Sequence, residues 1–278
     1  MNKNRKLAVL LTCFNRKENT LTCLKQLFHF NEDVAVYLVD DNSTDGTWEA
    51  VALQFPQVQL IRGTGDLFWN RGMHLAWEYA AKNDYDYYLW LNDDVVIYET
   101  CFEELFTCVK LKDDKAIISG IIESLDKETL YGGTDKNKQL IIPNGKLNAI
   151  TNMNGNVVLI PKNVYNKLGN LDPYFHHDLG DVDYGWRASK NGIGVFTTRI
   201  AIASGEKNDF CRVRLNNTSF SKRFKKLYSP LGSNPRINFY SKRKQFGFFN
   251  AAIYYLFLHF INFIPDNVNK KIFGKRYQ

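Results

Sequence analysis

The chain has 278 residues, 45% of them hydrophobic, and a formal net charge of +7 at pH 7. These values are those of an ordinary globular protein with one large domain, or with a domain and an appendage. The five cysteines are scattered and odd in number, which argues against a disulfide framework and against a structural zinc site. We therefore expect a reducing, cytoplasmic environment.

Basic residues are concentrated towards the carboxyl terminus. From Lys207 onward the chain carries 15 Lys and Arg against 2 Asp and Glu, whereas residues 1–206 carry 21 against 27. This asymmetry predicts a neutral to acidic catalytic body over 1–206 and a basic extension over 207–278 that contacts an anionic surface. Nucleic acid is an alternative partner for a basic, aromatic tail. It leaves the paired aspartates described below without a role, so we expect no nucleic acid.

The first 120 residues alternate between strand-like and helix-like segments. The apolar run at 6–14 follows basic residues as in a signal peptide, but it is short and lacks a cleavage site of small residues. We interpret it as a buried strand. The alternation is typical of an α/β layered domain with a largely parallel sheet. Strands are expected at 6–14, 34–40, 58–62 and 85–91, and helices at 17–30, 45–54 and 71–83.

The pattern becomes looser after the apolar run at 116–122. Turn signals at 131–133 and 143–145 predict hairpins in place of further parallel units. A later helix is expected to begin near Asp181 and to end before Gly192, which suits a carboxyl-terminal cap.

Residues 246–265 carry no charged side chain and are long enough for a membrane span. On a helix, however, Tyr255, His259, Asn262 and Asp266 share one face. A helix that lies in the membrane interface, with its basic flanks against anionic headgroups, fits this pattern better than a span. A core helix with basic flanks is the alternative.

Two of the four expected strands end in adjacent aspartates, Asp40–Asp41 and Asp93–Asp94. Ligands of an open α/β sheet bind beyond the carboxyl ends of its strands. Like charges at the end of a buried strand are unfavourable unless a cation offsets them, and Mg²⁺ or Mn²⁺ takes carboxylate and phosphate oxygens as ligands. A charged surface turn is the alternative for each pair. P-loop and dinucleotide-binding glycine motifs are absent from the sequence, which favours a metal as the group that holds phosphates.

A second cluster of polar residues lies at 171–192. Asp181 falls in the first turn of the expected helix, where it can cap the helix or act as a general base. Asp183 lies four residues before Arg187, the spacing of an intrahelical ion pair, and is interpreted as structural. The adjacent histidines of this segment lack a third ligand for zinc.

In chain order, the segments LLTCFNR, VDDNSTDGT, LNDDV, NGNVVLIPK and GDVDYGWRA resemble the family 2 glycosyltransferases. The resemblance covers residues 6 to about 200, and it implies an inverting enzyme with a nucleotide-sugar donor. The implied fold is GT-A, a Rossmann-like nucleotide-diphospho-sugar transferase fold with a mixed, mainly parallel sheet. Its nucleotide-sugar-binding half would lie at about 1–120 and its acceptor-binding half at about 121–206. Further segments, YGGTD and SPLGSNP, look like the bacterial, rhamnosyltransferase-like branch that builds surface polysaccharides.

The resemblance also implies roles for individual residues. Asp93 would meet the ribose, and Asp94 would coordinate Mn²⁺ or Mg²⁺ on the diphosphate; Asn92 replaces the first acid of the family's DXD motif, so metal binding would depend more heavily on Asp94. Asp181 matches the catalytic base, although Gly180 replaces an acid that many members carry before it. The nucleotide-binding residues implied are Thr12, Phe14, Asn15, Arg16, Asp41, Arg71, Asn92 and Asp93.

We expect a hexosyltransferase that moves one sugar from a UDP- or dTDP-sugar to a saccharide or lipid-linked acceptor. It would be peripheral on the inner face of the plasma membrane and serve capsule or O-antigen synthesis. The Q-x-x-R-W signature of processive synthases is absent from the sequence, which favours single addition. A non-catalytic sugar-binding or scaffold relative at the membrane is the main alternative. A nucleotidyltransferase would need a glycine-rich triphosphate loop after the first strand, and TCFNRKEN contains no glycine.

Overall fold

The computed structural model describes residues 5–207, 211–274 and 277. The chain divides into two compact units. Unit 1 comprises Met1–Pro173 and Gly180–Lys207, and unit 2 comprises Tyr174–Leu179 and Asn208–Gln278. The main division thus falls after Lys207, and a short segment from the middle of the chain belongs to the second unit.

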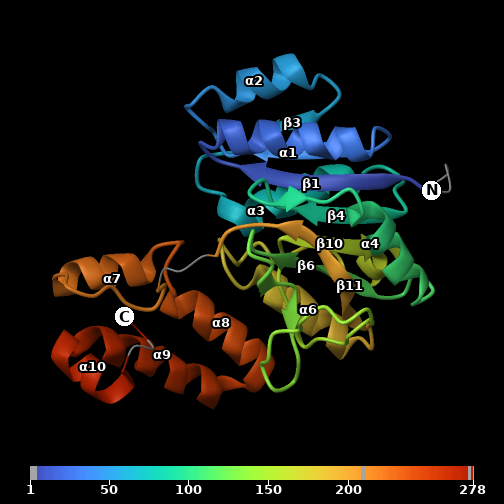
Figure 1. The fold of residues 1–278 in the computed structure, drawn as a ribbon. Coiled ribbons are helices and arrows are strands. Elements are labelled where there is room, and N and C mark those ends of the chain that lie inside the picture. The colour runs from blue at the N-terminus through green and yellow to red at the C-terminus, as the bar shows by residue number, and fades with distance from the viewer. Residues whose placement is uncertain (1–4, 208–210, 275–276, 278) are drawn as a thin grey trace. The chain divides into compact units, whose positions relative to one another are not determined.

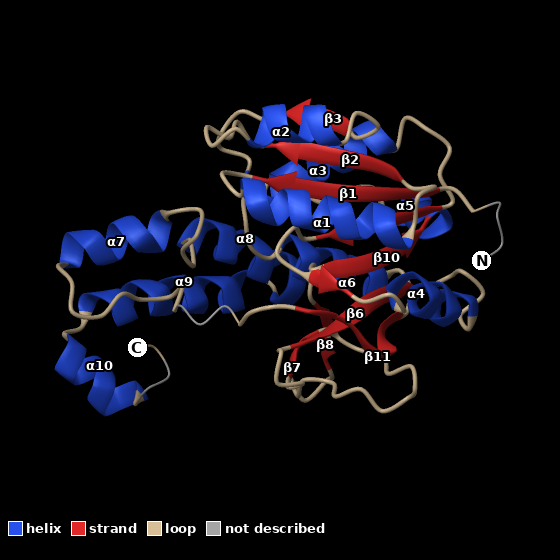
Figure 2. Ribbon diagram, turned by 45° about the horizontal axis from the view of Figure 1, so that its top comes forward, coloured by secondary structure: helices blue, strands red, loops and turns tan. Residues whose placement is uncertain are grey.

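A nine-stranded sheet forms the centre of unit 1, and its strands are red in Figure 2. The order is β3-β2-β1-β4-β10-β6-β11-β5, with β7 paired to β6. The first four strands of this order are mutually parallel, β10 is antiparallel to both of its neighbours, and β11 is parallel to β6. The expected GT-A architecture with a mixed, mainly parallel sheet is confirmed. The bounds are β1 Leu7–Cys13, β2 Ala35–Asp40, β3 Gln59–Arg62, β4 Tyr87–Leu91, β5 Val96–Ile97, β6 Ile117–Glu123, β7 Thr129–Tyr131, β10 Val157–Pro161 and β11 Val195–Ser204.

Helices cover both faces of this sheet, which explains why β1 and β4 are apolar at nearly every position (Figure 1). Alternate residues of β1 point to opposite faces. Leu7, Val9 and Leu11 belong to the core under one helical layer, and Ala8 and Leu10 belong to the core under the other. The first layer consists of α1 Lys17–Phe30, α2 Thr47–Gln54 and α4 Cys101–Lys110, and the second of α3 Phe68–Ala80, α5 Lys162–Leu168 and α6 Gly180–Lys190.

The predicted elements of the first 120 residues are confirmed with end shifts of up to three residues. Elements that were not predicted include β5, α4, β10, α5 and β11. The turn signal at 131–133 does separate two short strands, because β7 and β8 Gly133–Thr134 lie on either side of Gly132. Strand β8 pairs antiparallel with β9 Asn152–Met153. The signal at 143–145 lies within the long loop that joins β8 to β9, and not at a tight turn between two strands.

The regular secondary structure in the described part of unit 2 consists of helices. Asp266 joins its helices, because its carboxylate binds the guanidinium groups of Arg214 and Arg223, 2.5 and 2.7 Å away, and both arginine side chains are buried. Within the part of the chain that the structure describes, each helix is too short or too polar to cross a membrane. The helices are α7 Phe220–Tyr228, α8 Pro235–Phe246, α9 Phe248–Phe263 and α10 Asp266–Phe273.

Candidate active site

The candidate site lies where the parallel strands of unit 1 end. Strands β1, β2 and β4 run in the same direction, so the segments that follow them meet at one edge of the sheet. Hydrogen bonds join these segments. The backbone nitrogen of Asn15 donates to Ser43 Oγ at 2.9 Å, and Asn15 Oδ1 accepts from the backbone of Thr44 at 2.7 Å. Asn15 has the left-handed φ of +52° that this turn requires.

The first aspartate pair is held by the protein itself. Asp40 is fully buried, and it accepts hydrogen bonds from Arg62 at 3.1 Å and from the backbone of Ser43 at 2.9 Å. Asp41 is 3% exposed, and its carboxylate accepts from three backbone N–H groups, at 2.7, 2.8 and 3.1 Å. These donors belong to residues 65–68, so Asp41 organises the loop that leads into α3. Such bonds offset the burial of a carboxylate.

The predicted nucleotide-binding residues at the end of β1 and in α3 differ in exposure. Thr12 is partly buried beneath α3: a side-chain carbon added at Gly72 would lie 2.2 Å from Thr12 Oγ1, so the helix packs directly onto the strand at this point. Phe14 is 50% exposed at the end of the same strand. Arg71, in the first turn of α3, donates from Nε to the carbonyl of Pro173 at 3.0 Å.

The second aspartate pair is bridged by Arg16. Its two terminal nitrogens lie 3.2 Å from Asp93 Oδ1 and 3.2 Å from Asp94 Oδ2. Asp93 also accepts a hydrogen bond from Thr20 Oγ1 at 2.9 Å, and its side chain is 3% exposed against 37% for Asp94. Burial raises the pKa of Asp93 to about 6, although Arg16 and Thr20 act in the opposite sense. Asp94 is therefore the accessible carboxylate of the pair.

A divalent cation can be held here only with help from a ligand. Among the described residues there is no cluster of three or more His, Cys, Asp or Glu side chains that would form a complete protein site. Mg²⁺ and Mn²⁺ commonly take one or two carboxylates and complete their coordination with substrate phosphates and water. The accessible oxygen atoms of Asp94 fit that arrangement.

Asn92 links the end of β4 to the loop that precedes β10. Its Oδ1 accepts from Trp69 Nε1 at 2.6 Å, and its Nδ2 donates to Asn156 Oδ1 at 2.7 Å. The backbone nitrogen of Asn92 also donates to the carbonyl of Asn156 at 2.8 Å. Sequence reasoning placed Asn92 in the nucleotide site but did not single out Trp69 or Asn156. Their nearest signals were the segments FWNR and NGN, each of which is weak by itself.

Asp181 lies in the first turn of α6 and contacts the same loop. Its Oδ2 accepts from the backbone nitrogen of Gly155 at 3.0 Å, and its Oδ1 accepts from the backbone of Val182 at 2.8 Å. Gly155 is required by its surroundings, because an added side-chain carbon would lie 2.6 Å from the ring of Trp69. Asp181 and Asn92 therefore reach adjacent residues of a single loop, 154–156.

Gly180, where the resemblance leads one to expect an acid, packs against Asn70 of α3. A side-chain carbon at this position would lie 1.6 Å from Asn70 Oδ1, so Asn70 fills the space that a second acid would need. The Nδ2 atom of Asn70 donates to the carbonyl of Asp172 at 2.9 Å. The close packing against Asn70 thus explains why residue 180 is a glycine and not an acid.

Asp183 has the structural role that its spacing predicted. It is fully buried and accepts from Arg187 Nε at 2.9 Å. The same guanidinium donates to the carbonyls of Leu168 and Asn170, so the pair joins α6 to the end of α5.

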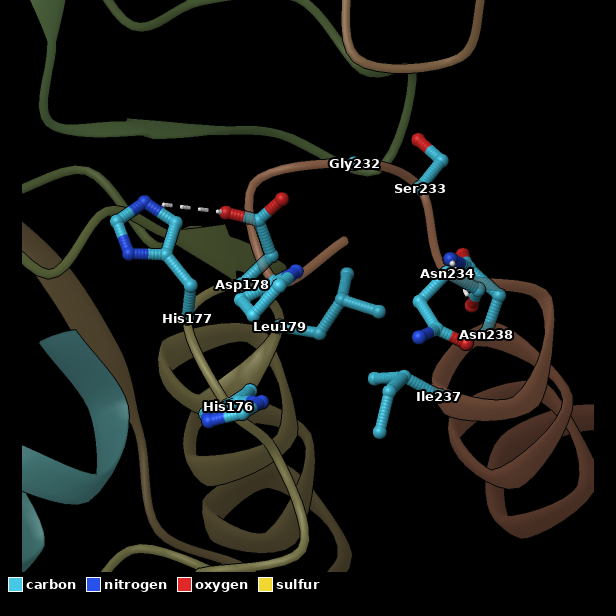
Figure 3. A pocket seen from close by; sticks show the side chains of 10 residues that line it. His176, His177, Asp178, Leu179, Gly232, Ser233, Asn234, Ile237 and Asn238 are labelled. Atoms are coloured by element: carbon cyan, nitrogen blue, oxygen red, sulfur yellow. Dashed lines mark hydrogen bonds and ion pairs between the residues drawn. The ribbon is translucent and has the colours of Figure 1, made fainter. Parts of the chain in front are cut away.

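The adjacent histidines of the 171–192 segment, and Asp178 after them, belong to unit 2. His177 Nε2 lies 3.7 Å from Asp178 Oδ1 (Figure 3). Asp178 also forms an ion pair with Arg212. Burial lowers the pKa of His177, although Asp178 acts in the opposite sense. With residues such as Asn234 and Ile237 these side chains line a pocket of about 90 Å³. That volume is small beside the roughly 300–1,000 Å³ of typical ligand pockets.

Together, the doubly covered sheet and the polar groups at its carboxyl edge define the class of α/β transferases with a GT-A fold. The chain belongs to glycosyl transferase family 2, whose model matches residues 8–169. Among curated proteins, none matches the chain.

Solved structures with similar folds are distant in sequence. S. aureus TarS is similar over 98% of this chain and 46% of its own, with a TM-score of 0.57 and 11% identity. Its 1–349 fragment is similar over 72% and 60%, with a TM-score of 0.54 and 14% identity. The mannosyltransferase PcManGT from Pyrobaculum calidifontis, in complex with GDP-Man and Mn²⁺, is similar over 90% and 74%, with a TM-score of 0.55 and 15% identity. This chain therefore spans about half to three-fifths of the two TarS structures.

Proposed function

We propose that this protein is an inverting glycosyltransferase that moves a single sugar from a nucleoside-diphosphate sugar to a hydroxyl group of its acceptor. One observation carries the proposal. The loop 154–156 binds Asn92, two residues before Asp94, and it also binds Asp181. A donor held at the end of β4 would thus have a carboxylate nearby that can accept a proton.

The nucleotide is assigned to the carboxyl ends of β1, β2 and β4. The exposed ring of Phe14 offers a surface for the base, beside Thr12, Asn15 and Arg71. Asp41 would accept the base N–H through lone pairs that its backbone donors leave open. Asn92 and Asp93 would contact the ribose side of the donor, with UDP or dTDP as the expected nucleotide. The similarity to a GDP-Man complex adds GDP to the donors worth testing.

Asp94 is assigned to the metal. Mn²⁺ or Mg²⁺ bound between Asp94 and the diphosphate would supply positive charge where the leaving group becomes more negative. Arg16 lies at the same carboxylates, and its guanidinium would have to release Asp94 or share it with the cation.

Asp181 is assigned as the general base. It takes the proton of the acceptor hydroxyl while that oxygen forms a bond to the anomeric carbon, and the bond from that carbon to the diphosphate oxygen breaks. A single displacement inverts the anomeric configuration and releases a nucleoside diphosphate. The hydrogen bond from Gly155 fixes the orientation of the carboxylate during this step.

The acceptor is assigned as a saccharide or a lipid-linked saccharide of a bacterial surface polysaccharide, such as capsule or O-antigen. The basic composition of 207–278 supports a peripheral position on the inner face of the plasma membrane, where lipid-linked acceptors are found. The rhamnosyltransferase-like branch remains part of this proposal.

A thermal-shift panel tests the donor and metal assignments. UDP-, dTDP- and GDP-sugars are added with and without Mn²⁺, since a ligand that binds only the folded state raises the melting temperature. We expect one donor class to raise it in a metal-dependent way, and Asp94→Asn to abolish the shift. If every donor leaves the melting temperature unchanged, the protein is a scaffold and not a transferase.

Turnover measurements test the base. Asp181→Asn should keep the donor-dependent shift and lose about 10² to 10⁴ in rate, which is the usual contribution of a general base. Asp178→Asn is the matched control, because Asp178 is paired with Arg212 in unit 2 and should keep its rate. Near-normal turnover in Asp181→Asn would move the base to Asp178 or His177.

A further inference from the structure

Helix α9 presents its polar side chains to the interior of unit 2. The Nε2 atom of His259 lies 2.8 Å from the hydroxyl of Tyr228 on α7. Asn262 is fully buried and donates from Nδ2 to the carbonyl of Val213 at 2.9 Å. The polar face seen in the sequence is thus used for packing within the unit, where Asn262 is buried and Tyr255 and His259 are partly buried.

The opposite face of α9 is apolar and exposed. Five of its side chains are between 51% and 82% exposed, and they recur at intervals of four, three, four and three residues. This spacing places them in one stripe along the helix. We refer to them as the outer face of α9: Phe249, Ile253, Leu256, Phe260 and Phe263.

The stripe continues onto the neighbouring helix. The ring of Phe263 packs against Phe220 of α7, with centroids 4.9 Å apart, and Phe220 is itself 48% exposed. Isolated exposed apolar residues are normal on protein surfaces, but a contiguous row of large ones usually marks a binding surface. At 16 residues, α9 is about 24 Å long. It can therefore lie along a membrane surface, although it is too short to cross one.

The charge of residues 207–278, which include most of unit 2, indicates which kind of surface could cover this face. From Lys207 onward the chain carries 15 basic residues and 2 acidic ones. Asp266 is occupied by Arg214 and Arg223 inside the unit. A second copy of the chain would bring the same excess of positive charge and would be repelled. An anionic lipid surface offers the opposite charge together with an apolar layer.

We infer that the outer face of α9 inserts into the boundary between headgroups and acyl chains of an anionic bilayer. Lysines of the adjoining helices, such as Lys222, Lys225, Lys270 and Lys271, contact the headgroups. The inference rests on the proposed function in one respect: a lipid-linked acceptor gives the enzyme a reason to be held at the membrane. The inference identifies the outer face of α9 as the surface through which the protein is held at the membrane.

Vesicle flotation of the full chain tests the inference. Vesicles of neutral phosphatidylcholine are compared with vesicles that also contain phosphatidylglycerol. The variant Phe249→Gln/Phe260→Gln removes two rings that are 82% and 51% exposed. The control variant Leu53→Gln/Leu125→Gln removes two apolar side chains of unit 1 that are 82% and 88% exposed. All four positions are on the surface, so both variants should fold normally, which melting temperature verifies.

We expect the wild type and the control to bind the anionic vesicles, to bind them less in high salt, and to bind neutral vesicles weakly. The partition coefficient of the Phe249→Gln/Phe260→Gln variant should be lower by about tenfold or more, because these two rings contribute much of the apolar area that enters the bilayer. Undiminished binding by that variant would overturn the inference. A second result would also overturn it: the wild type binds neither kind of vesicle and elutes as a dimer, and the Phe249→Gln/Phe260→Gln variant elutes as a monomer.

The donor-dependent thermal shift separates this inference from the proposed function. A Phe249→Gln/Phe260→Gln protein that keeps the shift but loses vesicle binding supports both. A wild type that binds vesicles through α9 but no nucleotide sugar supports the inference and overturns the proposed function.

Discussion

The two terminal nitrogens of Arg16 contact different carboxylates: Nη2 lies 3.2 Å from Asp94 Oδ2, and Nη1 lies 3.2 Å from Asp93 Oδ1. One positive charge thus holds together two adjacent negative ones at the end of β4. A divalent cation at Asp94 would do the same with twice the charge. Arg16 and the proposed cation therefore compete for one carboxylate.

Replacement of Arg16 by Gln should tighten Mn²⁺ binding. Without the guanidinium, the Asp94 oxygens lose a competing charge, and we expect the dissociation constant for Mn²⁺ to fall by about three- to tenfold, as for a partly exposed ion pair. Titration followed by electron paramagnetic resonance measures it without turnover. Arg62→Gln is the control, because Arg62 is equally exposed and pairs with a different aspartate, Asp40. An unchanged or weaker affinity in Arg16→Gln would show that no competition exists.

Replacement of Gly180 by Ala should destabilise the protein although alanine favours helices. The new side-chain carbon would overlap Asn70, and relief of such overlap in a packed region costs about 1–3 kcal/mol. Denaturant unfolding should show a loss of this size. Gly185→Ala, in the same helix, meets Met153 at an ordinary 3.4 Å and should be neutral or slightly stabilising.

A double-mutant cycle with Asn70 locates the cause of that loss. Asn70→Ala combined with Gly180→Ala should be less destabilising than the sum of the two single changes, since the overlap is removed. Strict additivity would mean that the glycine serves some purpose other than contact with Asn70.

Replacement of Glu104 by Gln should weaken the attachment of α4 to β11. Glu104 is 4% exposed and accepts from the backbone of Arg199 at 2.8 Å and from its Nη2 at 2.7 Å, beside a register shift in the strand. We expect a loss of about 2 kcal/mol in the free energy of unfolding at pH 7. Glu103→Gln, an exposed neighbour, should have little effect.

The difference between Glu104→Gln and the wild type should also depend on pH. Burial alone would raise the pKa of Glu104, but the hydrogen bonds from Arg199 and Cys108 outweigh it and hold the pKa below its ordinary value of 4.5. The unfolded chain therefore binds more protons, so the stabilisation is present above pH 4.5 and is lost as the pH falls through the folded pKa. A difference that stays constant down to pH 2 would contradict this account.

Replacement of Trp69 by Phe should weaken donor binding while preserving the fold. The change keeps a ring but removes the hydrogen bond from Nε1 to Asn92 Oδ1. One hydrogen bond contributes about 1 kcal/mol, so we expect about a fivefold rise in the dissociation constant of the donor. Calorimetric titration measures it, with Trp48→Phe as the control, because Trp48 stacks on Arg62 instead. Equal affinities in the two variants would mean that the orientation of Asn92 does not matter for the donor.

Local sequence patterns predicted most of the first half of unit 1. Strands β1 to β4 and helices α1 to α3 were identified because burial on both faces produces continuous apolar runs, and an amphipathic helix repeats every three to four residues. Helix α4 was missed although its buried residues recur at helical spacing. Strands β10 and β11 were also missed, because the turn signals after β6 were interpreted as hairpins and not as a loop that returns to the same sheet.

The positions of the aspartates were readable in the sequence, but their partners were not. Adjacent carboxylates after two strands could be seen directly. That three backbone N–H groups hold Asp41, and that Arg16 spans Asp93 and Asp94, depends on contacts between segments up to 78 residues apart. No local pattern encodes such a distance.

By itself, then, the sequence determined the α/β architecture, the strand ends at which a site could form, and the basic character of the last 72 residues. Only the tertiary structure decided that Asp181 and Asn92 meet on one loop, that Asn70 fills the space beside Gly180, and that α9 faces outwards with its apolar side. The physical reason is that periodicity records whether a side chain is buried, whereas its partner is chosen by the packing of elements that are distant along the chain.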